Sequence, residues 1–366
     1  LRHGNIQQAT ADLVLENAKA QLSPELEALS FKYIAGRVSA KVKPNGFDFS
    51  TAGLRFDTAD GLHWPGGNVS LSYLETDTGE SSQGRFQGDA LDLLALRNIA
   101  LQLPLPPSAR QTLEAHKVSG LVNTLNLEWT ENKTGPEKTF QVKAANGRFD
   151  NFYFEAGKSG SASEYWPGIE NANISFEMTA DGGQIKTSIE KGALQINRLF
   201  EDSRIPLDKM QASVKWQYEK NKLLVPDWQL SLKNADISAD LKGSWKPSLL
   251  ADSRGLLDLQ GNIQQVDATR VHRYLPLSLP QNVRHYVRDA ILKGTVQGVA
   301  VKVKGDLKLL PFANPKDGEF RFAGKVKDVL YAYVPATNLN LAERNNNPES
   351  VWPPMSEVNG DVVLDR

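Results

Sequence analysis

The chain has 366 residues, a length that suits two or three domains or one elongated domain. Its 42 basic and 43 acidic side chains leave a net charge of −1, which excludes a strongly basic surface for nucleic acid. It has no cysteine, and this excludes disulfides, thiolate catalysis and cysteine-ligated zinc or iron–sulfur centres.

Alternation of apolar and polar residues predicts a mainly β chain with a few short helices. At the N-terminal side, residues 9–20 are the exception, and we expect a helix there. The clearest strands follow in chain order at residues 38–42, 69–73, 121–129, 174–178, 228–232 and 298–304. Turn pairs such as Asn45-Gly46 and Asn146-Gly147 between these runs favour antiparallel meanders. At the usual spacing the chain could hold about 20–30 strands.

Two more helices are predicted, at residues 107–117 and 280–292. In the second, Val283 and Val287 recur at helical spacing, and Gly294 provides the stop signal. Each helix begins at a proline, which suits the first turn.

These helical segments belong to an internal duplication. With a shift of 174 residues, segment 101–122 aligns with segment 275–296, and seven of 22 positions are identical. The identical pairs are Leu101/Leu275, Leu103/Leu277, Leu105/Leu279, Pro106/Pro280, Arg110/Arg284, Gly120/Gly294 and Val122/Val296. A match at a fixed period indicates a repeat architecture.

A second repeated block contains a Trp-Pro pair. Trp166-Pro167 is followed by Asn173, and Trp352-Pro353 is followed by Asn359, each asparagine lying seven residues after its tryptophan. Trp64-Pro65 is a looser third instance. We therefore expect two tandem β-rich units. The first spans about 30–205, with its clearest match at 88–180. The second spans 206–366, is clearest at 262–366, and is truncated.

The repeated motifs resemble a known family. The run Val266-Asp267-Ala268, then Arg273-Tyr274-Leu275-Pro276, a helix, Gly294 and Gly305-Asp306-Leu307 resembles the YhdP branch of the AsmA-like proteins. The Trp-Pro block, preceded by an Asp-x-x-Tyr strand, is similar to that family as well. The resemblance is strongest over residues 262–366, and a weaker similarity extends over residues 88–180.

The resemblance implies an elongated, curved antiparallel sheet, an open repeating β-groove with an apolar lining, of which residues 1–366 are one continuous fragment. It also implies a Gram-negative periplasmic location within an inner-membrane-anchored protein, the anchor and flanking repeats lying outside this chain. Family members are implicated in phospholipid transport from inner to outer membrane, outer-membrane biogenesis and cell-envelope integrity. The implied partner is phospholipid, and the family brings no catalytic residue, cofactor, metal or nucleic acid.

Strict alternation gives a sheet one apolar face, and lipid tails can replace the missing core at about 0.8 kcal/mol per buried methylene. The predicted lining residues lie on such faces: Val299, Val301, Val303, Leu307, Ile174, Phe176, Leu230 and Leu232. Arg284 and Arg288 share one helix face and are candidates for a phosphate headgroup, although a solvated face balanced by Asp267 and Asp289 explains them too. Aspartate at Val301 or Phe176 is expected to block lipid co-purification and to leave the fold largely intact.

The residues alone leave other functions open. The sheet could instead form two ordinary sandwiches, used for adhesion or glycan binding through exposed tryptophans. A polysaccharide hydrolase would need two facing carboxylates, which one sequence cannot show. The five histidines, His3, His63, His116, His272 and His285, lack metal-ligand spacing.

Overall fold

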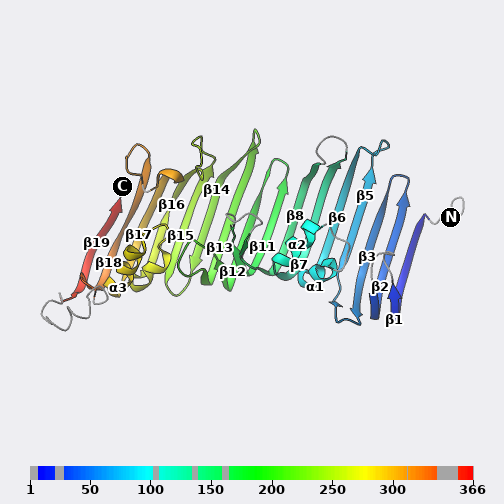
Figure 1. Cartoon of the computed structure of the whole chain (residues 1–366), viewed down its shortest axis with the longest axis horizontal. Coiled ribbons are helices and arrows are strands. Elements are labelled where there is room, and N and C mark those ends of the chain that lie inside the picture. The colour runs from blue at the N-terminus through cyan, green and yellow to red at the C-terminus, as the bar shows by residue number, and fades with distance from the viewer. Residues whose placement is uncertain are drawn as a thin grey trace. The chain divides into compact units, whose positions relative to one another are not determined.

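The computed structural model describes residues 7–20, 29–101, 107–133, 139–158, 165–310, 312–335 and 353–365 (Figure 1). Within these residues, seventeen strands form one open antiparallel sheet, and β9 (Gly157–Lys158) and β10 (Tyr165–Trp166) form a separate pair. Helices are few and short. The predicted mainly β class is confirmed.

The chain divides into two compact units, of which the first comprises Leu1–Gly157 and Gly168–Lys186. Its strands pair with their neighbours from β1 to β8 and then from β8 to β11, and β3 pairs with both β4 and β5. The elements are β1 (Gln8–Ala20), β2 (Leu29–Lys43), β3 (Gly46–Thr58), β4 (His63–Trp64), β5 (Asn68–Glu75), β6 (Ser81–Asp92), α1 (Leu93–Leu101), α2 (Pro107–Ala115), β7 (Val118–Asn132), β8 (Thr139–Phe154) and β11 (Gly168–Thr179).

The second unit comprises Lys158–Pro167 and Thr187–Arg366, and β12 (Gly182–Gln195) spans the boundary between the units. From β13 to β19 each strand pairs with the next in antiparallel fashion. The elements are β13 (Arg204–Glu219), β14 (Lys222–Lys233), β15 (Ile237–Lys246), β16 (Leu256–Asp267), the 3-10 helix η1 (Ala268–Tyr274), α3 (Gln281–Ala290), β17 (Ile291–Asp306), η2 (Leu307–Leu309), β18 (Gly318–Tyr331) and β19 (Met355–Asp365).

The helix expected at residues 9–20 is wrong, because this segment is strand β1. It pairs antiparallel with β2 from Gln8↔Lys41 to Ala20↔Leu29. Asn17 has a φ of 53° and interrupts the ladder locally, while the register is the same on both sides of it. The consecutive apolar residues Leu13, Val14 and Leu15 break the strict alternation and resemble a helical pattern, but pairing with β2 overrides that local preference.

The other helices follow the sequence more closely. The structure confirms helices at 107–115 and 281–290 and adds α1, whose start is capped by Asp92 Oδ1 accepting from the Ala95 N–H at 2.8 Å. The described residues contain nineteen strands, fewer than expected, because most hairpin strands run 12–16 residues instead of the usual five or six.

Several of these long strands contain bulges, and the same hydrogen bond, which we call a bulge clasp, occurs at three of them. A residue with positive φ donates its N–H to an asparagine Oδ1 of the next strand, in the pairs Gly53–Asn68 (2.8 Å), Asn151–Asn173 (3.1 Å) and Asp328–Asn359 (3.1 Å). Asn173 and Asn359 are the asparagines that follow their Trp-Pro tryptophans by seven residues, whereas Asn68 follows Trp64 by four. The repeated spacing therefore encodes a bulge clasp. Trp166 itself is 54% exposed and does not pack into a core, whereas Trp352 lies outside the described residues.

Candidate functional site

Cross-strand rows place apolar side chains on one face of the second unit. Residues directly opposite each other in antiparallel strands project to the same side. Three such rows are Leu232–Ala239–Ile263–Val299, Leu230–Leu241–Gly261–Val301–Phe322 and Trp228–Gly243–Leu259–Val303–Phe320. Five of the predicted lining residues, Leu230, Leu232, Val299, Val301 and Val303, therefore lie together on this face.

These five side chains differ in burial. Val299, Val301 and Val303 are only 6–8% exposed, whereas Leu230 and Leu232 are half-buried. Across the strands, Val301 is directly opposite Gly261 and Phe322, and Val303 is directly opposite Leu259 and Phe320. Aspartate at Val301 would therefore disturb the fold, contrary to the sequence-based expectation.

Leu307 is the outlier of this group, because it lies in η2 and not in a strand row. It is half-buried, and its N–H donates to the Gly255 carbonyl at 3.0 Å. The neighbouring Asp306 side chain caps η2 by accepting from the Lys308 N–H at 2.9 Å.

The first unit has an equivalent apolar face. Its rows include Val69–Gly88–Leu125–Gly147–Phe176, Leu71–Phe86–Leu127–Ala145–Met178 and Val122–Phe149–Ile174. The predicted residues Ile174 and Phe176 are both half-buried here. The Phe176 ring stacks on Phe149 with centroids 6.0 Å apart, so aromatic contacts tie these rows together.

The opposite face of each unit is polar. Arg85 pairs with Glu128 across β6 and β7 at 2.7 Å, and Lys304 pairs with Asp258 across β17 and β16 at 3.0 Å. Both pairs are well exposed, so their contribution to stability is small. The two faces thus differ in chemistry as strand alternation predicts.

Helices lie against the strands of both units, and in the first unit α1 covers part of the apolar face. In the first unit α1 lies beside β6 and β7 (Figure 1), and its Ala95 joins a buried cluster with Trp64, Leu91 and Val122. In the second unit η1 contacts β16 and β17. Among the described residues, the extensive contacts between strands are those of neighbours within the sheet. The sandwich left open by the sequence is therefore not formed there.

The predicted headgroup arginines both have carboxylate partners. Arg284 is 8% exposed, and its Nη1 donates to Glu201 Oε2 at 3.2 Å while its Nε donates to the Leu279 carbonyl at 3.3 Å. Arg288 is exposed and binds Asp289, an interaction that raises the pKa of the Arg288 guanidinium. Arg284 thus anchors α3 to the chain between β12 and β13.

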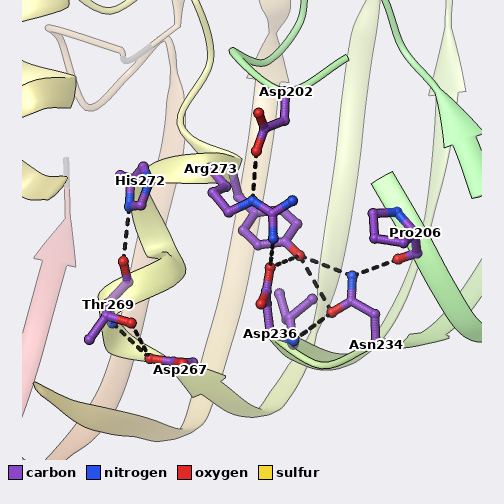
Figure 2. Close-up of polar contacts among 10 residues, drawn as sticks. Asp202, Pro206, Asn234, Asp236, Asp267, Thr269, His272 and Arg273 are labelled. Atoms are coloured by element: carbon purple, nitrogen blue, oxygen red, sulfur yellow. Dashed lines mark hydrogen bonds and ion pairs between the residues drawn. The ribbon is translucent and has the colours of Figure 1, made fainter. Parts of the chain in front are cut away.

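A polar network fastens η1 to the loops beside it (Figure 2). Arg273 donates through Nε to Asp202 at 2.7 Å and also binds Asp236, and the hydrogen bond to Asp202 raises the pKa of its guanidinium. Burial raises the pKa of the neighbouring Tyr274 hydroxyl, which lies 3.2 Å from Asp236 and receives a 3.0 Å hydrogen bond from the Asn234 amide. The arginine and the tyrosine therefore have structural partners at this position.

Arg273 belongs to the family-like run noted in the sequence, but its acidic partners could not be predicted from the sequence. Asp202 and Asp236 precede Arg273 by 71 and 37 residues. No spacing rule links residues so far apart, and only the folded loops bring them together.

The described residues show little that suggests a reactive centre. They contain no group of three or more His, Asp or Glu side chains placed to hold a metal ion. His63, His116, His272 and His285 are on separate elements or loops, and His3 lies outside the described residues. Trp166, which is about half exposed, is the one tryptophan of those described that is classed as exposed, so they provide no row of rings for a glycan. No helix among them has the length and apolarity needed to cross a membrane.

Comparison with known proteins gives one informative result. The model of the family described as YhdP protein matches residues 1–366. Searches of curated proteins and of solved structures gave no match. Because the family model matches along the entire sequence, the chain belongs to the YhdP protein family.

Proposed function

We propose that the chain shields phospholipid acyl chains on its apolar faces, as a periplasmic segment of a protein that moves phospholipid between the inner and outer membranes. The observation that carries the proposal is the set of cross-strand rows of large apolar side chains, which no second sheet of described residues covers. Membership of the YhdP family supports the same role.

The free energy of transferring an acyl chain suits a protein that carries lipid without retaining it. A chain of about fifteen methylenes gains on the order of 12 kcal/mol when it leaves water for an apolar surface. A bilayer gives nearly the same gain, so transfer from bilayer to protein is close to neutral and the lipid is not trapped. Such a role is non-enzymatic and requires no nucleophile or metal.

Headgroups would remain toward water, and we propose contact with Arg288 in preference to Arg284. The Arg288 side chain is 42% exposed, whereas the Arg284 side chain is 10% exposed and anchors α3 to Glu201. Adhesion to glycans is less well supported, because the described part of the chain lacks a platform of exposed tryptophans.

Adjacent residues of β14 offer a matched test. Leu230 lies on the apolar face, and Ser231 is exposed on the polar face. We expect phospholipid, measured by mass spectrometry of organic extracts, to accompany the purified parent chain and Ser231→Asp, and to be depleted in Leu230→Asp. A lipid-free parent, or equal lipid in both variants, would contradict the proposal.

A further inference from the structure

Two glycines of the first unit lie beneath aromatic rings of the neighbouring strand. Gly84 in β6 is directly opposite Trp129 in β7, and Gly147 in β8 is directly opposite Phe176 in β11. A Cβ at residue 84 would lie 2.0–2.6 Å from three atoms of the Trp129 ring. At residue 147 it would lie 2.7 Å from the Phe176 ring. Both rings occupy the space that a side chain would fill.

The backbone does not explain these glycines. Neither Gly84 nor Gly147 has a positive φ, so other residues could adopt their conformation. The nearest atoms to a Cβ at either position all belong to side chains. Glycine also weakens a strand, since it loses more entropy on folding and packs nothing.

Gly243 in the second unit provides a contrast. It is directly opposite Trp228, but the closest atom to a Cβ there is the carbonyl oxygen of Asp258, at 2.1 Å. At that position the missing side chain allows two backbones to approach. At Gly84 and Gly147 it makes room for a ring.

We infer that Gly84 and Gly147 determine the clearance above the apolar face, because they let Trp129 and Phe176 lie flat along the sheet. The inference rests on the proposed function. A methyl group at residue 84 would displace the indole outward, into the space that an acyl chain needs. The surface would remain apolar while its accessible depth decreases, as glycines in strands commonly mark the close approach of a ligand.

The test uses the full chain and vesicle-delivered, fluorescently labelled phosphatidylethanolamine as the probe. We expect Gly84→Ala to lower probe affinity about tenfold, equivalent to ~1.4 kcal/mol or about two methylenes left uncovered. The double variant Gly84→Ala/Trp129→Leu is expected to recover the affinity of the single variant Trp129→Leu, because the displaced ring is gone. Gly147→Ala and Gly147→Ala/Phe176→Leu form a second, independent pair.

Folding is followed by circular dichroism and urea unfolding. If Gly84→Ala alone fails to fold, the double variant is still expected to fold, whereas Gly243→Ala should stay impaired when combined with Trp228→Leu. Unchanged affinity in Gly84→Ala, or a double variant that recovers neither fold nor binding, would overturn the inference. A parent chain that binds no probe would instead refute the proposed function.

Discussion

Val301 tests whether the valines form a buried layer beneath the larger apolar side chains. It is 6% exposed and lies directly between Gly261 and Phe322. Truncation to alanine removes two methyl groups, worth about 1.6 kcal/mol in transfer and nearer 2 kcal/mol with the cavity. Aspartate adds the cost of burying a carboxylate, so we expect Val301→Asp to lose more than about 3 kcal/mol of unfolding free energy.

Ala300 is the matched control, since it is the preceding residue of β17 and is exposed on the polar face. Lys242, Lys302 and Arg321 line the same region, so a new carboxylate there meets favourable charge. Urea unfolding should leave Ala300→Asp within about 0.5 kcal/mol of the parent. If Val301→Asp is as stable as Ala300→Asp, the valine rows are not a buried layer and the assignment of faces is wrong.

Three further predictions concern polar contacts. Asn173→Ala removes the clasp on the Asn151 N–H and should cost about 1 kcal/mol in thermal unfolding, and an unchanged melting temperature would refute the clasp. Asp306 accepts hydrogen bonds from two serine hydroxyls, which hold the pKa of its carboxyl below the usual value. The contribution of Asp306 to stability is therefore complete above the ordinary carboxyl pKa of about 4 and is lost as the pH falls through the lowered pKa. In Asp306→Asn we expect the unfolding free energy to fall less steeply as the pH is lowered than it does in the parent. An unchanged pH dependence would exclude Asp306 as its source. Arg273→Ala leaves Asp236 without its cation and should cost on the order of 3 kcal/mol and speed proteolysis near η1, whereas parental cleavage rates would contradict the anchoring role.

The sequence predicted the faces well, because period-two alternation is a local property of each strand. Leu230, Val301 and Phe176 could each be assigned to an apolar face without knowing any partner strand. Their burial depends instead on which residues are opposite, so the depth of Val301 beneath its neighbours was not predictable. The register also determines which glycines meet aromatic rings, as at Gly84 and Trp129.

Helix prediction failed where tertiary contacts outweigh local pattern. Residues 9–20 become a strand because β2 pairs with them in one register from Gln8 to Ala20, and the apolar run Leu13, Val14 and Leu15 hides the alternation in the sequence. Helix α1 was missed, although Asp92 gives it a recognisable cap. The Trp-Pro repeat was visible in the sequence, but only the folded bulges show that its asparagines clasp backbone N–H groups.

Photo-crosslinking along β14 tests the central claim most directly. A benzophenone amino acid would be placed in turn at Gln229, Leu230, Ser231 and Leu232, which alternate between the two faces. The account predicts phospholipid adducts at Leu230 and Leu232 and none at Gln229 and Ser231. Adducts at all four positions, or at none, would contradict it.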